Sequence, residues 1–347
     1  MMERITGSQL EDLFQQFTGK KVMIIGDVMI DAYLWGKVDR ISPEAPVPVV
    51  SVKKRESLLG GAANVALNIR ALQAVPLLCS VIGNDVRGDE FLGLLKQDGI
   101  SGEGIVRCPD RVTTTKFRII GNNAQMLRVD EEMDSDLNTS EEHQLLEVIE
   151  GMLITGKVSV IIMQDYNKGV LTRQLIQRVL VRAGELGIPV VVDPKHKNFD
   201  AYKGVSLFKP NLKELKEGLN IDAEINSTEL IRKAVADWQT MQSIVSMMVT
   251  LSEAGLFIRD TTGGEVKEYL IPAHLRKIAD VSGAGDTVIS VAALCKALNL
   301  PAYFTAALSN IAGGLVCEYV GVVPVNRDRL LKEARLLLTG ESSFPVK

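Results

Sequence analysis

The segment from Asp280 to Asp286, D-V-S-G-A-G-D, has the residue types and spacing of a phosphate-binding turn. Gly283, Ala284 and Gly285 lead into an apolar run with helical periodicity, so their backbone N–H groups can approach a phosphate at the positive end of a helix dipole. Asp286, in the first helical turn, could accept a proton from a substrate hydroxyl. The alternative interpretation is an ordinary glycine turn whose aspartate stabilises the helix dipole.

A second glycine pair, Gly60 and Gly61, precedes another predicted helix. Asn64 and Asn68 are four residues apart in that helix and therefore share one face. Side-chain amides in this arrangement can bind sugar hydroxyls through paired hydrogen bonds. A simple turn followed by solvated asparagines is the alternative.

Asn211 and Glu214 lie three residues apart at the start of a further predicted helix. This spacing is typical of a capping box, in which each side chain bonds the backbone of the other residue. Glu214 could also help to hold a hydrated magnesium ion, because Mg²⁺ keeps most of its waters and takes few protein carboxylates. The two interpretations are compatible.

Acidic side chains follow three apolar runs that we interpret as strands: Asp27, Asp165 and Asp193. In open parallel sheets ligands bind beyond the carboxyl ends of the strands, so we expect these acids to line a common crevice. Lys168 and Lys195 follow two of the same strand ends and could bind phosphate as point charges. Each residue alone is also typical of a turn or of solvated surface charge.

The elements that must position these residues alternate between short apolar runs and helical patterns, which predicts an α/β fold with a mostly parallel central sheet flanked by helices. The predicted strands cover residues 21–25, 76–82, 158–163, 189–192, 207–208 and 246–251, and the predicted helices cover residues 62–72, 89–97, 171–185, 212–217, 227–238 and 284–298.

Two stretches, residues 35–57 and 112–129, interrupt this alternation because apolar and polar residues follow each other with period two. They predict a small β lid. Lys116, Arg118 and Arg128 add positive charge to its second segment and could meet a phosphorylated substrate.

The composition excludes several classes of protein. Of the 347 residues, 46% are hydrophobic and 24% charged, as in ordinary globular proteins. The net charge is −4 and no block of Lys or Arg occurs, so a nucleic-acid or membrane partner is not expected. The four cysteines lack C-x-x-C spacing and no apolar leader or membrane-spanning run is present, which favours free thiols in the cytoplasm.

Two common nucleotide-binding motifs are absent from the sequence. No G-x-G-x-x-G follows the first predicted strand, and no G-x-x-x-x-G-K-[ST] occurs anywhere. The first absence argues against dinucleotide binding and the second excludes an ordinary P-loop.

Taken in order, these residues resemble the ribokinase-like, or PfkB, family of carbohydrate kinases from about residue 21 to residue 325. The two signatures of that family appear as Gly60 to Ala66 and as Asp280 to Asp286, and its N-x-x-E motif as Asn211 and Glu214. The resemblance implies a single ribokinase-like kinase domain over residues 1–347, with ATP and Mg²⁺ as cofactors.

The resemblance also implies roles for individual residues. Asp286 becomes the catalytic base, and the three residues before it form the anion hole. The residues implied to contact the nucleotide, its phosphates or magnesium are Lys195, Asn211, Glu214, Thr250, Ser252, Gly255 and Asn310.

Within the family, segments such as R-I-S-P-E-A-P-V-P-V-V, D-Y-N-K-G and G-A-G-D-T-V-I look most similar to the kinases of D-glycero-β-D-manno-heptose 7-phosphate. This similarity implies phosphorylation of the anomeric hydroxyl to give heptose 1,7-bisphosphate, a step of ADP-heptose and lipopolysaccharide synthesis. Because lids in the family often pair, a homodimer is also implied. The candidate contacts to the sugar and its phosphate are Asp31, Gly60, Gly61, Asn64, Lys116, Arg118, Arg128, Asp165 and Lys168.

Two residues depart from the pattern: Ser282 replaces the usual Thr of the signature, and His196 follows D-P-K where heptose kinases usually have Gly. Neither departure removes a reacting group. With only three histidines and no H-x-G-H motif, the chain is expected to lack the adenylyltransferase activity fused to some relatives. Another sugar kinase of the family, such as a ribokinase, fructokinase or keto-deoxy-gluconate kinase, or a non-catalytic sugar or nucleotide sensor of the same fold, remains an alternative.

Overall fold

The computed structural model describes residues 5–221, 228–274 and 276–339. In chain order its elements are α1 (Gly7–Phe17), β1 (Lys21–Gly26), β2 (Val28–Ile41), β3 (Pro48–Gly61), α2 (Ala62–Ala71), β4 (Val75–Gly83), α3 (Val86–Gln97), β5 (Ile105–Cys108), β6 (Thr115–Gly121), β7 (Ala124–Glu131), α4 (Thr139–Gly156), β8 (Val160–Gln164), α5 (Arg173–Leu186), β9 (Val190–Asp193), β10 (Leu207–Phe208), α6 (Leu212–Gly218), α7 (Thr228–Gln242), β11 (Ser246–Thr250), β12 (Leu256–Asp260), β13 (Lys267–Ile271), α8 (Ala284–Ala297), α9 (Ala302–Val316) and α10 (Arg327–Leu338).

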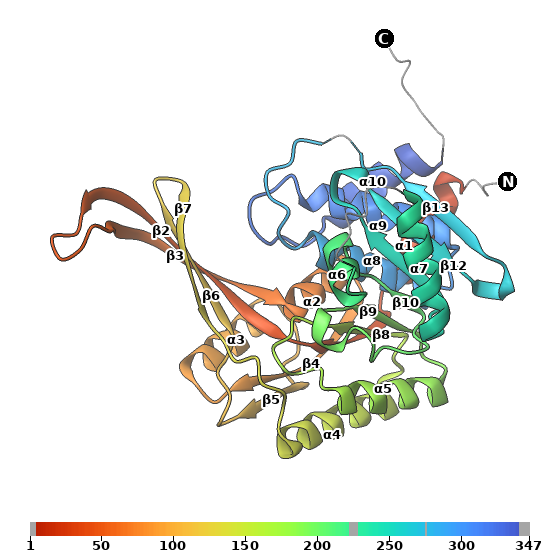
Figure 1. Cartoon of the computed structure of the whole chain (residues 1–347), viewed down its shortest axis with the longest axis horizontal. Helices are drawn as coiled ribbons and strands as arrows, with labels where there is room; N and C mark the ends of the chain where they lie inside the picture. Colours follow the sequence, from red (N-terminus) through yellow and green to blue (C-terminus); the bar gives the residue numbers. More distant parts are fainter. Residues whose placement is uncertain (1–4, 222–227, 275, 340–347) are drawn as a thin grey trace, which may run out of the picture.

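The central sheet has nine strands in the order β13-β12-β11-β10-β9-β8-β1-β4-β5 (Figure 1). All neighbours are parallel except at the β13 edge, where β12 pairs antiparallel with both β11 and β13. Strands buried on both faces need apolar residues at every position, and β8 is buried throughout. The predicted α/β fold with a mostly parallel sheet is therefore confirmed.

The core consists of two layers, one on each face of this sheet. Successive strand residues point to opposite faces, so Ile24 packs with the residues of α1, α2, α8, α9 and α10, whereas Ile25 packs with those of α4, α5 and α7. Both isoleucines are fully buried. The sheet thus holds α8, and the glycine turn before it, at a fixed place over one face.

A second, four-stranded sheet with the order β3-β2-β6-β7 forms the lid and projects away from the body (Figure 1). Strand β2 pairs antiparallel with β3 and parallel with β6. Strands β2 and β3 begin earlier and end later than the predicted stretch 35–57, because the first residues of β2 are buried near the body and lack alternation. Strands β6 and β7 begin three residues later than the predicted stretch 112–129 and end two residues later. The lid therefore starts directly at the end of β1 and returns directly into α2.

Several helices were not predicted from the sequence, namely α1, α4, α9 and α10. Helix α9 lies mostly in the core, and a helix buried on most sides has no amphipathic period to detect. The predicted helix over 227–238 corresponds to α7, although its first residue lies outside the described residues. None of the helices in the described ranges is long and apolar enough to cross a membrane.

Candidate active site

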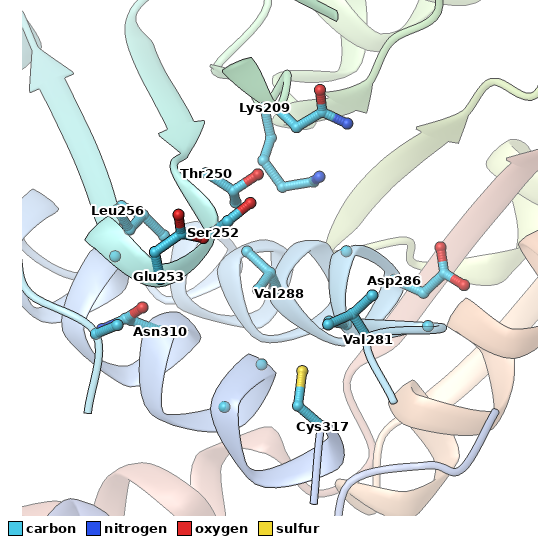
Figure 2. A pocket seen from close by; sticks show the side chains of 18 of the residues that line it. Lys209, Thr250, Ser252, Glu253, Leu256, Val281, Asp286, Val288, Asn310 and Cys317 are labelled. Atoms are coloured by element: carbon cyan, nitrogen blue, oxygen red, sulfur yellow. The ribbon is translucent and has the colours of Figure 1, made fainter. Parts of the chain in front are cut away.

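A cavity of about 630 Å³ lies beyond the carboxyl ends of β9, β10 and β11, over the start of α8. Figure 2 shows Asp286 toward one end and Thr250, Ser252 and Asn310 toward the other, with Lys209 between them. Every residue predicted for the phosphoryl-transfer centre or the nucleotide lines this cavity: Lys195, Asn211, Glu214, Thr250, Ser252, Gly255, Gly283, Ala284, Gly285, Asp286 and Asn310.

The turn before α8 depends on glycine. Gly283 is the N-cap residue and adopts φ 77°, in the left-handed region that favours glycine. A Cβ at this position would lie 3.0 Å from Asn64 Nδ2. No side chain of the described residues caps this helix start, which leaves the N–H groups of its first turn available to an anion.

Asp286 is surrounded by hydrogen-bond donors and only 4% exposed. Its Oδ2 accepts a hydrogen bond from Asn64 Nδ2 at 2.7 Å, and its Oδ1 accepts from Tyr166 Oη at 2.7 Å and from Gln164 Nε2 at 3.1 Å. Burial raises the pKa of Asp286 to about 6, against the opposing effect of the Asn64 and Tyr166 bonds. At neutral pH the carboxylate is therefore mostly ionised and able to act as a general base.

Two lysines supply positive charge beside this carboxylate. Lys209, only 2% exposed, forms an ion pair with Asp193 at 3.0 Å. Lys195 pairs with Glu214, and although burial opposes it, the carboxylates of Asp193 and Glu214 raise the pKa of Lys195. Sequence reasoning missed Lys209, whose only signal is its place between the end of β10 and Pro210.

The predicted capping box at α6 is present. Asn211 Oδ1 accepts from the N–H of Glu214, and Glu214 Oε2 accepts from the N–H of Asn211, both at 2.8 Å. Glu214 is nearly buried and still lines the cavity. The box therefore fixes the direction of the Glu214 carboxylate.

Asp27 and Asp165 do not line the cavity, unlike Asp193, so the three strand-end acids do not share one crevice. Asp27 instead accepts the backbone N–H groups of Tyr166, Lys168 and Val170 at 2.8, 3.1 and 3.0 Å.

The carboxylate of Asp165 also contacts the loop after β8, which contains Tyr166 and Lys168. It accepts hydrogen bonds from Tyr202 Oη at 2.8 Å and from the N–H of Asn167 at 2.8 Å. Burial, followed by the nearby charge of Asp27, raises the pKa of Asp165 to about 6. Both acids thus hold the loop that carries Tyr166 and Lys168.

Asn64 and Asn68 have different surroundings despite their shared helix face. Asn64 contacts Asp286, whereas Asn68 Oδ1 accepts from Thr287 Oγ1 and from the N–H of Val325, both at 3.0 Å. Both asparagines are fully buried, but Asn68 joins α2 to α8, whereas Asn64 lies against the cavity residue Asp286. The hypothesis of two sugar-binding amides therefore reduces to Asn64.

Asp31 lies in the lid against the glycine pair before α2. A Cβ at Gly60 would fall 2.5 Å from Asp31 Oδ2, and one at Gly61, with φ 60°, would fall 2.4 Å from the carbonyl oxygen of Asp27. Asp31 also forms an ion pair with Arg118. The two glycines thus permit the close approach of the lid to the body.

The remaining basic residues form a chain of ion pairs from the lid to the body. Lys116 Nζ lies 3.2 Å from Asp130 and 2.9 Å from Glu132, and Arg128 Nε lies 2.9 Å from Asp130. Lys168, from the loop after β8, reaches the same Glu132 at 2.7 Å. The predicted phosphate contacts therefore converge where the lid meets the body, outside the 630 Å³ cavity.

Ser282 performs a local structural role. Its N–H and its hydroxyl both donate to Asp280 Oδ1, at 3.0 and 2.9 Å. The N–H of Gly321 donates to the other oxygen of Asp280 at 2.9 Å. A serine at this position therefore supports the turn through its hydroxyl.

Comparison with known proteins identifies several similar chains. The chain is 36% identical to the bifunctional protein HldE of Citrifermentans bemidjiense, over 94% of this chain and 65% of that protein. It is 41% identical to HldE of Helicobacter pylori, over 78% of this chain and 57% of that protein. The chain thus spans less than two thirds of the length of these curated relatives.

The crystal structure of phosphofructokinase-2 from Escherichia coli in complex with potassium has the same fold, with a TM-score of 0.75 and 18% identity, over 93% of this chain and all of that one. The family profile described as pfkB family carbohydrate kinase matches residues 19–329. The chain therefore belongs to the PfkB family of ATP-dependent carbohydrate kinases.

Proposed function

We propose that this kinase transfers the γ-phosphoryl group of ATP to the anomeric hydroxyl of D-glycero-β-D-manno-heptose 7-phosphate, giving heptose 1,7-bisphosphate for ADP-heptose and lipopolysaccharide synthesis. The observation that carries the proposal is the convergence of Lys116 and Lys168 on one carboxylate, Glu132. A sugar phosphate entering under the lid would compete with that carboxylate for both lysines. The sequence resemblance to heptose 7-phosphate kinases supports the same substrate.

The loop after β8 links this basic pair to Asp286, which supports a sugar that carries both a phosphate and the reacting hydroxyl. Lys168 lies two residues after Tyr166, whose hydroxyl contacts Asp286. Arg118 and Arg128 lie on the same face of the lid sheet, because they are directly paired in the register of β6 and β7. We assign Asp31, Asn64 and the Gly60–Gly61 pair to the sugar hydroxyls in between.

In the proposed reaction Asp286 accepts the proton of the anomeric hydroxyl. The sugar oxygen then bonds to the γ-phosphorus, and the bond from that phosphorus to the bridging oxygen of ADP breaks. Backbone N–H groups of residues 283–285 would stabilise the charge on the transferred group at the start of α8. Lys195 and Lys209 would compensate the charge of the phosphates that remain on ADP.

We also propose that Mg²⁺ accompanies ATP. The site fits a mostly hydrated ion, because Glu214 faces the cavity and no group of three or more possible ligands among His, Cys, Asp and Glu occurs in the described residues. Glu214 would hold the ion through water, with its carboxylate oriented by Asn211. When bound, the ion supplies positive charge that neutralises the phosphates.

A coupled assay of ADP formation tests this function. We expect turnover with heptose 7-phosphate, little with ribose or fructose, and loss of activity on chelation that added Mg²⁺ restores. Preference for an unphosphorylated sugar would contradict the substrate assignment, and activity that survives chelation would contradict the metal. All four cysteines are free and buried, which supports the reducing cytoplasm as the place of the enzyme.

We further propose that the lid mediates a homodimer. By the register of β6 and β7, Phe117 and Val129 lie on one face of the lid together with Ile119 and Leu127. Leu127 is 55% exposed and Val129 46%. An exposed apolar face on a projecting sheet is suited to cover by the same face of a second copy.

Sedimentation velocity tests the dimer. We expect the unmodified protein to sediment as a dimer and Leu127→Asp as a monomer, because a buried, unpaired carboxylate would oppose association. Leu336→Asp is a matched control, since Leu336 is 44% exposed on α10, outside the lid. A monomeric unmodified protein, or a dimer unaffected by Leu127→Asp, would refute the lid interface.

A further inference from the structure

The hydroxyl of Tyr166 lies against the atom that must receive the substrate proton. It donates to Asp286 Oδ1 at 2.7 Å, and Gln164 Nε2 donates to the same oxygen at 3.1 Å. These two donors occupy both lone pairs that a carboxylate oxygen offers in its plane. A substrate hydroxyl that is to donate to this oxygen must therefore displace one of these two donors.

Of the three donors to Asp286, Tyr166 is the one on the accessible side. Asn64 is fully buried in α2 and Gln164 is 1% exposed at the end of β8, so both are fixed by the core. Tyr166 is partly exposed and lines the cavity, with Lys195 Nζ 5.5 Å from the centre of its ring. The displaceable group is therefore the tyrosine.

The backbone that carries Tyr166 is held in place by contacts that do not involve its side chain. Asp27 accepts the N–H groups of Tyr166, Lys168 and Val170, and Asp165 accepts the N–H of Asn167. Asn167 itself adopts φ 55°, a left-handed conformation that asparagine tolerates. Displacement of the hydroxyl thus needs only rotation of the tyrosine side chain and no movement of the loop.

We propose that Tyr166 caps the catalytic base when no sugar is bound, and that the entering sugar hydroxyl displaces it. This inference rests on the proposed role of Asp286 as the base. In the capped state water cannot lose a proton to Oδ1 of Asp286, and so cannot use that oxygen to bond to the γ-phosphorus and release ADP. The tyrosine therefore suppresses wasteful hydrolysis of ATP until the acceptor is present.

Tyr166→Phe tests the cap, because it removes the hydroxyl and keeps the ring. We expect release of ADP from ATP alone to rise roughly tenfold, as for loss of one hydrogen bond to a charged group. The kcat with heptose 7-phosphate should change little, and the acid limb of the pH profile of kcat should not move. The hydrogen bond from Tyr166 to Asp286 is already broken in the complex with both substrates. Tyr269→Phe, on the distant strand β13, should leave both rates unchanged.

Other outcomes separate the cap from two different explanations. If Tyr166 only positions the base, Tyr166→Phe lowers kcat and moves its acid limb to higher pH, with no gain in hydrolysis; this result overturns the cap. Unchanged hydrolysis with normal kcat also overturns it. Adding Asp286→Asn to Tyr166→Phe should return hydrolysis to the unmodified level, and hydrolysis that persists would refute Asp286 as the base.

Discussion

Replacing Asp286 with asparagine is expected to reduce kcat by roughly 10²- to 10⁴-fold or more, the range typical of a lost general base. Asparagine has nearly the same shape but cannot accept the proton of the sugar hydroxyl. The anion-binding turn and the charged residues of the cavity remain, so the affinity for ATP should change little. Initial rates with heptose 7-phosphate, together with calorimetric binding of ATP, measure the two effects separately.

The stability of this variant supplies a check on the interpretation. Burial raises the pKa of Asp286 from 3.8 to about 6, so its contribution to stability is present at low pH and is lost as the pH rises through about 6. At pH 7 the buried, ionised carboxylate lowers the free energy of unfolding, and the neutral amide of asparagine removes this penalty. The loss of activity should therefore not reflect unfolding. Asp200→Asn, at an exposed carboxylate, serves as the matched control with unchanged kcat. A near-normal rate for Asp286→Asn would remove Asp286 from the reaction.

The clustering of the residues that we assign to the nucleotide could be predicted because they lie in short contiguous motifs. Gly283 to Asp286 and the pair Asn211 and Glu214 each combine a local backbone signal with a chemical one, and the structure places both motifs on the same cavity. Helical periodicity after Asp286 also located α8 correctly. Local sequence therefore predicted both the glycine turn and the helix that follows it.

The surroundings of the base could not be predicted, because they depend on contacts between distant segments. Gln164 and Tyr166 reach Asp286 across more than a hundred residues of sequence, and nothing in D-Y-N-K-G indicates which side chain faces inward. The same limit applies to Asp27 and Asp165, which look like cavity residues in the sequence but hold a loop instead. The position of a residue at a strand end predicts which part of the fold it lies in, but it does not predict where its side chain points.

The buried pair of Lys209 and Asp193 should make the site sensitive to a second substitution, Lys209→Met. The lysine is 2% exposed, the aspartate 5%, and their charged atoms lie 3.0 Å apart. Removing the lysine leaves Asp193 buried without its ion-pair partner, with the charge of Lys195 and a hydrogen bond from Gln164 still nearby, and should cost about 3–5 kcal/mol of unfolding free energy. The midpoint of urea unfolding, compared with that of the unmodified protein, measures the loss.

A double substitution separates the charge effect from lost packing. Lys209→Met combined with Asp193→Asn should recover most of the stability, because no unpaired charge remains. Lys213→Met is the matched control at an 83% exposed lysine and should shift stability by less than about 0.5 kcal/mol. A loss below about 1 kcal/mol for Lys209→Met alone would contradict the importance of the pair.

Activity should not recover together with stability in the double variant. Lys209 Nζ would lie 3.7 Å from a Cβ at Gly285, so its charge is adjacent to the turn that we propose for the transferred phosphoryl group. Restoring the fold without this charge leaves that group less stabilised in the transition state. A folded double variant with a normal kcat would show that Lys209 serves only to neutralise Asp193, whereas a folded, slow variant would give it both roles.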